Sequence, residues 1–363
     1  MKTLEVDYDL GAVGGGQMPA SPLRLMILGG AGGTHVGDSL RRAAVRLGYS
    51  VQLVNVSNAF AASRIRQWFY WHLLDRMPAD MPSFEKHVLA SVFEWKPHVL
   101  LTTGIAPLGA NALQKIATSE TICINFSTDD PWNPAHKARW FLRALKEYHC
   151  VFTPRKVNVG DFIGLGVKNV HYVRFGYDPE IFYPLSASEL ASASAFGDQV
   201  VFAGGADRDR IPYIEAFLRA GIGVALYGDI WRKNRKTRRI ARGQADARTL
   251  RLAIGSSKVA LCLVRRANRD GSSMRTFEVP AVGAAMLVED TVEHREIFGE
   301  EGAAVLYFST IEELISKTST LLADPTEVER LARAAKAAIR LGGNTYEDRL
   351  RQMLSFALRR SES

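Results

Sequence analysis

The sequence is poor in cysteine, and none of its cysteines is spaced for a CxxC motif. Only three occur among 363 residues, Cys123, Cys150 and Cys262, and each lies in an apolar or semi-apolar stretch. An odd number of dispersed thiols does not fit the disulfide framework of a small secreted domain. The cysteines are therefore predicted to be buried thiols in a reducing compartment.

Long apolar runs are also absent. No stretch of eighteen apolar residues occurs, and the first residues, MKTLEVDYDLGAVGGGQM, carry acids and glycines where a signal peptide would be basic and then apolar. The sequence thus predicts a cytoplasmic protein without a membrane-spanning helix. Residues 1–22, which include three consecutive glycines and a proline, are expected to form a flexible leader.

Positive charge is concentrated in one segment. The formal net charge is +8, and residues 231–242, WRKNRKTRRIAR, hold seven basic residues and no acid, which leaves 8 − 7 = +1 elsewhere. This segment could be a solvated helix face, or it could attract an acidic substrate or an anionic membrane surface, where each Lys or Arg contributes about 1 kcal/mol. Trp231 at its edge would suit such an interface. Nucleic-acid binding is less favoured, because no recognition motif accompanies the charge.

Apolar strands alternate with helical patterns along most of the chain. A length of 363 residues predicts two to three domains, and the alternation predicts an α/β architecture with parallel sheets. The strands are expected at residues 23–30, 51–56, 98–104, 120–126 and 150–154, and then at 200–205, 223–228, 258–264, 284–290 and 303–309.

A glycine-rich turn follows the first expected strand. Glycines 29, 30, 32 and 33 do not match the GxGxxG spacing, so a dinucleotide fingerprint is not supported. Without a Cβ, Gly32 and Gly33 permit close approach of the backbone to a ligand, phosphate groups included.

The richest stretch for chemistry is 265–290, which follows the apolar strand 258–264. Arg265, Arg266 and Arg269 lie on a loop there, and Ser272 or Ser273 is a plausible N-cap for the helix that follows. A helix starting at the carboxyl end of a parallel strand points free backbone N–H groups into the crevice where such sheets bind ligands. The nearby arginines would bind phosphate.

Two carboxylates frame this stretch. If the helix is continuous, Asp270 and Glu278 lie close to one face, about 12 Å apart along its axis. Two carboxylates in this arrangement can accept hydrogen bonds from hydroxyl groups on two parts of one ligand.

The phrase RTFEVPAVGAAMLVED, residues 275–290, resembles the donor-sugar site of retaining glycosyltransferases with the GT-B fold, and it is most similar to the CgeB-like group, related to glycosyltransferase family 4. The resemblance covers roughly residues 145–350. It includes VRFGYDPEIFYP at 173–184, VVFAGGADRDR at 200–210 and NTYEDRL at 344–350. In many such enzymes a glutamate stands where this chain has Asp270, and a histidine where it has Asn344.

This resemblance implies a GT-B fold, in which two Rossmann-like, doubly wound α/β domains face each other across a cleft. Residues 23–174, with the terminal helix 345–363, would form the acceptor domain. Residues 175–344 would form the domain that binds the nucleotide-sugar donor.

The implied activity is that of a hexosyltransferase, which moves a sugar from a nucleotide-diphosphate sugar to an acceptor hydroxyl with retention and without a metal or tightly bound cofactor. Arg210 and Arg275 would lie near the phosphates, with Arg269 in support. Glu278 would accept the ribose hydroxyls, and Asp270 would face the sugar.

Candidate catalytic residues lie in the first half. Asp130, after an apolar strand, could orient or deprotonate the acceptor hydroxyl, but Asp before Pro131 is also a common turn former. Trp132 could stack on a sugar ring. His35, in the glycine-rich turn, could accept a proton, although a lone loop histidine is also commonly solvated.

Other functions are open at this stage. They are a catalytically silent GT-B module that binds a nucleotide sugar or a partner protein, a nucleotide-sugar epimerase or glycogen-phosphorylase-like enzyme, and a nucleic-acid or membrane-surface adaptor that acts through residues 231–242. The donor base, the donor sugar and the acceptor, whether glycan, lipid or small molecule, are not readable from the sequence.

Overall fold

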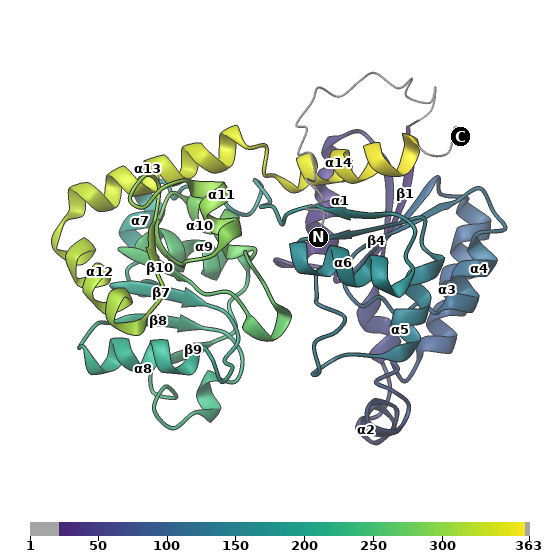
Figure 1. The fold of residues 1–363 in the computed structure, drawn as a ribbon, viewed down its shortest axis with the longest axis horizontal. Coiled ribbons are helices and arrows are strands. Elements are labelled where there is room, and N and C mark those ends of the chain that lie inside the picture. Colours follow the sequence, from purple (N-terminus) through teal and green to yellow (C-terminus); the bar gives the residue numbers. More distant parts are fainter. Residues whose placement is uncertain (1–21, 360–363) are drawn as a thin grey trace, which may run out of the picture.

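The chain folds into two halves, each built on a parallel six-stranded sheet with helices packed on its faces (Figure 1). The computed structural model describes residues 22–359. Residues 1–21, which make up most of the predicted leader, lie outside the described residues. The expectation of two doubly wound, Rossmann-like units is confirmed.

The first sheet has the strand order β2-β1-β3-β4-β5-β6. In β1, Leu25 and Ile27 pack into one apolar cluster while Met26 and Leu28 pack into another, and all four are fully buried. A strand buried on both faces needs apolar side chains at every position, which explains its continuous apolar sequence. The elements of this half are β1 (Arg24–Gly29), α1 (Val36–Arg46), β2 (Ser50–Asn55), η1 (Val56–Phe60), α2 (Arg64–Leu73), α3 (Met81–Trp95), β3 (Val99–Thr103), α4 (Ala110–Ile116), β4 (Ile122–Phe126), α5 (Arg139–Ala144), η2 (Leu145–Glu147), β5 (Cys150–Thr153), α6 (Lys156–Leu165) and β6 (Val170–Tyr172).

The second sheet has the order β12-β11-β10-β7-β8-β9. In each sheet, successive strands are added first on one side of the starting strand and then on the other. This reversal of strand order leaves a crevice at the carboxyl ends of the strands, where ligands bind in such folds. The crevices lie between β1 and β3 and between β7 and β10. The elements are α7 (Ala187–Ser192), β7 (Val200–Ala203), α8 (Ile211–Arg219), β8 (Val224–Tyr227), η3 (Trp231–Lys233), β9 (Ala241–Gly243), α9 (Ala247–Ser256), β10 (Val259–Cys262), η4 (Arg266–Asn268), α10 (Arg275–Val282), β11 (Ala285–Glu289), α11 (Val292–Phe298), β12 (Leu306–Phe308), α12 (Ile311–Ala323) and α13 (Pro325–Leu341).

The basic segment 231–242 is not a helix, so its interpretation as a solvated helix face is wrong. It forms the short η3 turn, a loop and the start of β9. Trp231 is fully buried, and its indole Nε1–H donates to the Gly204 carbonyl oxygen at 2.7 Å. The tryptophan therefore anchors the segment instead of serving as an exposed interface residue.

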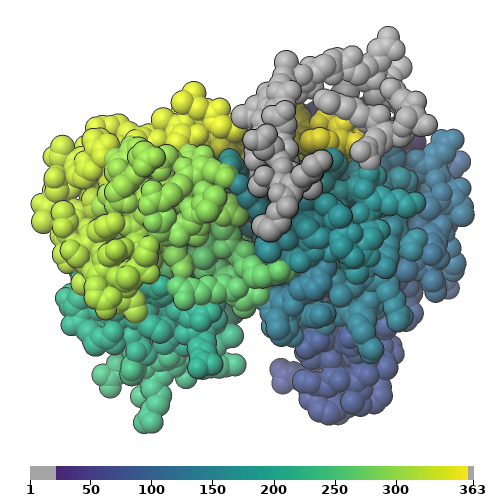
Figure 2. Space-filling model, in the orientation of Figure 1, coloured from purple at the N-terminus to yellow at the C-terminus, as the bar shows by residue number. Residues whose placement is uncertain are grey.

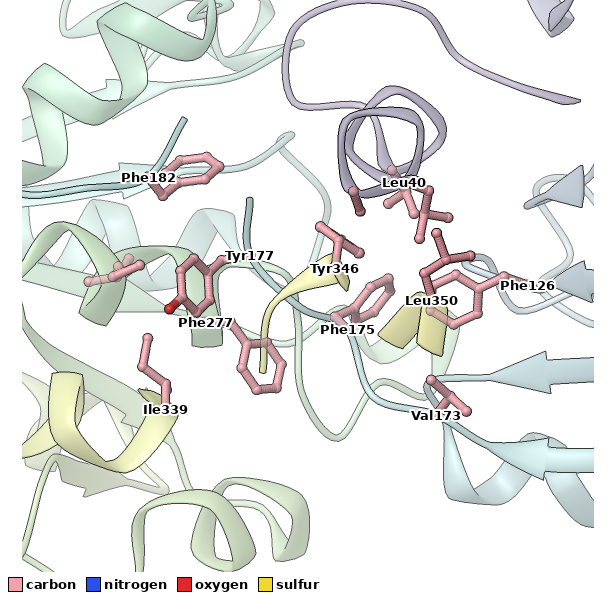
Figure 3. Packing of buried hydrophobic residues seen from close by; sticks show 14 of the residues in the cluster. Leu40, Phe126, Val173, Phe175, Tyr177, Phe182, Phe277, Ile339, Tyr346 and Leu350 are labelled. Atoms are coloured by element: carbon pink, nitrogen blue, oxygen red, sulfur yellow. The ribbon is translucent and has the colours of Figure 1, made fainter. Parts of the chain in front are cut away.

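The terminal helix α14 (Tyr346–Arg359) returns to the first half, where it packs against α1. Figure 3 shows Tyr346 and Leu350 beside Phe175 at this junction. The chain first crosses near Tyr177, which forms a parallel bridge with Thr345, so the two crossings run side by side. Residues from both halves thus contribute to one continuous apolar core.

Candidate functional site

A cleft of about 650 Å³ lies between the two halves. Figure 2 shows the halves separated by a groove that opens at the lower edge of the view. The loops after β1, β7 and β10 reach the cleft, so the carboxyl ends of strands at both reversal points face each other. The lining residues are Ala31 to His35, Ala203 to Ala206, Tyr227 to Ile230, Gln244 to Ala247, Leu250, Arg265 and Arg275.

The first half contributes its glycine-rich turn to the cleft. Gly32 and Gly33 have φ angles of +79° and +56°, in the region that glycine occupies without strain. A Cβ at either position would meet nothing within 4 Å, so these glycines leave open space beside the backbone. His35 is exposed at the N-cap of α1 and also lines the cleft. The structure thus brings together the three residues of this turn that the sequence singled out.

The second half contributes the loop after β7, which contains Gly204 and Gly205. Beneath this loop lies the buried Arg210, whose guanidinium donates to the carbonyl oxygens of Gly205 at 3.3 Å and Leu263 at 3.2 Å. Burial, together with the charge of Arg265, lowers the pKa of Arg210. Arg210 therefore braces two cleft-lining loops and is not itself among the lining residues.

Arg275, the first residue of α10, reaches the cleft. Its Nε–H donates to the Ala203 carbonyl oxygen at 3.2 Å, and its Nη1 forms an ion pair with the Glu278 carboxylate. Burial lowers the pKa of Arg275 to about 10, so the group is still a cation at neutral pH. Glu278 is buried beneath it and does not line the cleft. In this state the carboxylate orients Arg275, and its predicted contact with ribose stays a prediction.

The expectation of one helix from Ser272 through Glu278 is wrong, because α10 begins at Arg275. Its N-cap is Met274, and neither predicted serine caps it. The side-chain hydrogen bond at this helix start comes from Thr276 instead. Its hydroxyl oxygen accepts from the Ser273 N–H at 3.0 Å. Asp270 therefore lies in the preceding loop, not on one helix face with Glu278.

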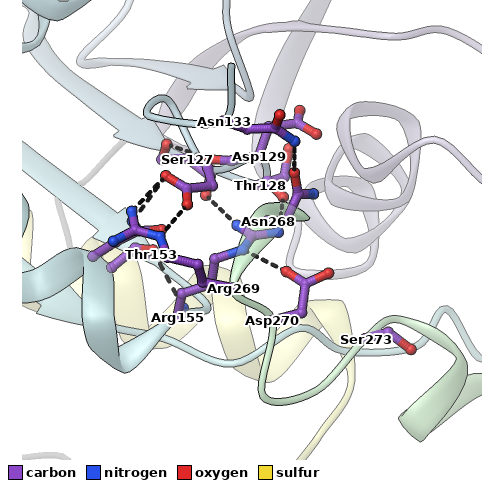
Figure 4. Close-up of polar contacts among 12 residues, drawn as sticks. Ser127, Thr128, Asp129, Asn133, Thr153, Arg155, Asn268, Arg269, Asp270 and Ser273 are labelled. Atoms are coloured by element: carbon purple, nitrogen blue, oxygen red, sulfur yellow. Dashed lines mark hydrogen bonds and ion pairs between the residues drawn. The ribbon is translucent and has the colours of Figure 1, made fainter. Parts of the chain in front are cut away.

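The loop of residues 265–271 crosses to the first half and binds there (Figure 4). Asp270 accepts from Arg155 at 2.5 Å, and Arg269 donates to both carboxylate oxygens of Asp130, at 2.6 and 2.9 Å. Arg269 also forms an ion pair with Asp161 at 2.8 Å. These pairs join residues more than a hundred positions apart, so they tie the two halves together.

An amide pair completes this contact. The Asn133 side chain donates to the Asn268 side-chain oxygen at 2.6 Å, and both residues are buried. Arg269 adopts φ +52°, an uncommon value for a residue with a side chain, which turns its guanidinium toward the first half. The 265–271 loop is thus held by polar contacts from three consecutive residues.

The carboxylates at this contact differ in their electrostatics. Burial would raise the pKa of Asp130, but the hydrogen bonds from Arg269 prevail and lower it. For Asp270 burial prevails over Arg155, so its pKa lies above the ordinary value. Neither residue lines the cleft, so the proton-transfer role predicted for Asp130 and the sugar contact predicted for Asp270 stay predictions.

Several cleft residues were missed in the sequence. Asp229 and Gln244 face the cleft and join through a hydrogen bond of 2.6 Å between Gln244 Nε2 and Asp229 Oδ2. The position of Asp229, two residues after an apolar strand, was the available signal. Gln244 follows β9, a three-residue edge strand with no apolar run, so the sequence gave no indication of it.

Among residues 22–359, no group of three or more His, Cys, Asp or Glu side chains is arranged to hold a metal ion. The charged groups that line the cleft are Asp229, Asp246, Arg265 and Arg275, together with His35.

Residues 210–355 match the family model described as glycosyl transferase-like. No curated protein matches the chain. Among solved structures, the chain is similar to sucrose-phosphate synthase from Thermosynechococcus elongatus, at 14% identity and a TM-score of 0.66 over 94% of this chain and 100% of that one. HepE of Anabaena in complex with UDP-glucose matches at 13% identity and a TM-score of 0.63, over 92% and 100%.

A protein assigned as a UDP-N-acetylglucosamine 2-epimerase in Listeria monocytogenes matches at 12% identity and a TM-score of 0.57, over 94% and 98%. These likenesses, with the two sheets, show that the chain has the GT-B fold. The expected fold is confirmed.

Proposed function

We propose that this chain is a glycosyltransferase, which moves a hexosyl group from a nucleotide-diphosphate sugar to an acceptor hydroxyl with retention at the anomeric carbon. One observation carries the proposal. The glycine loops after β1 and β7 face each other across the cleft, with Arg265 and Arg275 beside them. The match of residues 210–355 to a glycosyl transferase-like family model supports the same function.

In this proposal the second half binds the donor. The diphosphate lies beside Gly204 and Gly205, where the backbone can approach closely, and Arg265 and Arg275 supply fixed positive charge. As the bond between C1 and the diphosphate oxygen breaks, negative charge builds on the leaving group. Preorganised cations stabilise that charge. The reaction therefore requires neither a metal ion nor a tightly bound cofactor.

The first half binds the acceptor in this proposal. The acceptor oxygen forms the new bond to C1, and its proton passes to a base or to the departing diphosphate. His35 is the candidate base, because its exposed imidazole lines the cleft. Asp130 and Asp270 can take part only after the 265–271 loop withdraws, since both carboxylates are held in ion pairs. We propose that Arg210 and Glu278 are positioning residues for the donor site.

The test is a thermal-shift and transfer screen of the full chain against UDP-, GDP-, ADP-, CMP- and dTDP-sugars, with and without EDTA. Arg265 and Arg266 form a matched pair. Arg265 lines the cleft, whereas Arg266 is bound to Glu289 at 3.0 Å and does not. We expect stabilisation by one nucleotide class that survives EDTA, weakens in Arg265→Gln and Arg275→Gln, and persists in Arg266→Gln.

Three outcomes would contradict the proposal. Equal stabilisation of all variants would show that the arginines of the cleft do not bind the diphosphate. Nucleotide binding without sugar release or transfer to any acceptor would indicate a catalytically silent binding module. Interconversion of the donor sugar without transfer would indicate an epimerase.

A further inference from the structure

Helix α2 carries an apolar surface that no other element of residues 22–359 covers. Ile65 is 83% exposed and Trp68 60% exposed, and no residue of the helix is buried. Seven of the large exposed apolar residues of the described chain lie between residues 60 and 74. They are Phe60, Ile65, Trp68, Phe69, Trp71, Leu73 and Leu74. A surface helix normally turns its apolar side chains toward the core, so this concentration calls for a partner.

The exposed face of α2 is its apolar face. At about 100° per residue, Gln67 and Tyr70 lie on one side of the helix, and these are its two less exposed residues. Trp68, Phe69 and Leu73 lie on the opposite arc and are exposed. The helix therefore rests on the protein with a polar and a tyrosine side chain and presents aromatic and aliphatic groups outward.

The charge around this face is positive. Residues 60–74 contain Arg64 and Arg66 but no aspartate or glutamate. The first acid after the helix, Asp75, is bound to Arg139, since it accepts from the Arg139 backbone N–H at 2.5 Å. A second copy of the chain docked on this face would bring arginines against arginines. An anionic partner fits better.

The basic segment 231–242 provides a second cationic element. Arg232, Lys233, Arg235, Lys236, Arg238 and Arg239 are exposed there. Within the described chain only Lys236 among these six has a carboxylate partner, Glu215 at 2.9 Å. In Figures 1 and 2, α2 and the segment leading to β9 both extend from the lower edge of the molecule, one from each half.

We propose that α2 and residues 231–242 form one docking surface for an anionic lipid bilayer. Tryptophan and arginine together favour the membrane interface, where the ring enters the headgroup zone and the charge meets lipid phosphate. The apolar face of α2 supplies the insertion, and the basic segment supplies the attraction to the surface. Within residues 22–359 no helix is long and apolar enough to cross a membrane.

Vesicle co-sedimentation of the full chain without nucleotide tests this surface. The probes are vesicles of phosphatidylcholine alone and of phosphatidylcholine with phosphatidylglycerol. We expect binding only to the anionic vesicles, with a blue shift of tryptophan emission. Added salt should weaken it, because exposed charges are screened over about 10 Å at 0.1 M salt. The measurement needs no sugar transfer, so failure of the proposed function would leave it interpretable.

Matched variants separate the two elements. Ile65→Ser should lower the partition coefficient about tenfold, because an exposed isoleucine no longer enters the interface. Leu341→Ser, which removes a 90% exposed leucine at the end of α13, is its control and should bind as the wild type does.

Arg238→Gln with Arg239→Gln tests the basic segment and should lower binding about thirtyfold at low salt, at about 1 kcal/mol per charge. The control for that pair is Arg333→Gln with Arg340→Gln on α13.

Three results would overturn the proposal. The first is an absence of binding to anionic vesicles. The second is equal binding of the Ile65 and Leu341 variants, which would remove α2 from the surface. The third is light scattering that shows a dimer dissociated by Ile65→Ser, which would make a second copy the occupant of α2. Thermal unfolding midpoints of all variants should stay near the wild-type value, because the substituted side chains are exposed.

Discussion

Lowering the pH from 7 to 5 should destabilise the second half of the molecule through one buried imidazole. His294 is fully buried in α11, with its Nδ1 2.7 Å from the Glu289 carbonyl oxygen and its Nε2 3.0 Å from the Thr276 hydroxyl. The carbonyl can only accept, so Nδ1 carries the proton and Nε2 accepts from Thr276. Protonation of Nε2 would break this pattern at the first turn of α10.

The expected loss follows from the pKa. Burial lowers the pKa of His294 from 6.5 to about 4. Between these values the unfolded chain binds more protons than the folded one, so the free energy of unfolding falls as the pH falls through this window. The loss is about 2 kcal/mol at pH 5 and about 3 kcal/mol below pH 4.

Urea unfolding at pH 7 and pH 5, in parallel for wild type and His294→Asn, measures this effect. Asparagine can still donate to the Glu289 carbonyl, but it does not titrate. The variant should be less stable at pH 7 because it leaves a small cavity, and the gap to wild type should narrow at pH 5. If both proteins lose the same free energy of unfolding between the two pH values, His294 is not held neutral and the reasoning is refuted.

Two other changes have defined outcomes. Arg269→Gln should increase the radius of gyration measured by small-angle X-ray scattering, because it leaves two carboxylates of the first half without their cation. Arg295→Gln removes an arginine of similar exposure, which pairs with Asp290 within the second half, and should leave the radius unchanged. Gly228→Ala should lower the unfolding midpoint and abolish nucleotide binding. A Cβ at this position would overlap the Gly204 carbonyl oxygen, and Gly228 has a φ angle of +138°, which a residue with a side chain rarely adopts. Wild-type nucleotide affinity in this variant would show that the cleft wall can shift.

The architecture was readable because both sheets are parallel and buried on both faces. Strands of this kind are then apolar over most of their length, as Val99–Leu101 in β3 and Ala285–Val288 in β11 are, and such runs stand out in a sequence. The strands β6 and β9 were missed for the converse reason. Each has three residues at a sheet edge, is only partly buried and lacks an apolar run.

The site was only partly readable, because local pattern does not reveal which partner a charged side chain finds. The run after β10 indicated a group of cations beside a helix start, and Arg265 and Arg275 do reach the cleft. Asp270 and Arg269 lie in the same run but bind Arg155 and Asp130, residues far away in the sequence. Nothing near those positions distinguishes a ligand contact from a contact between domains.

The ion pairs of the 265–271 loop lower the apparent affinity for a ligand that contacts the same carboxylates. If a ligand uses Asp270 or Asp130, the ion pairs of the loop must first dissociate, so the apparent affinity is the intrinsic affinity multiplied by the fraction of molecules already open. Salt raises that fraction by weakening the pairs, and it also weakens attraction of an anionic ligand to the arginines of the cleft. The two effects oppose each other, so affinity for such a ligand should fall less with added salt than affinity for a ligand that contacts only the arginines of the cleft.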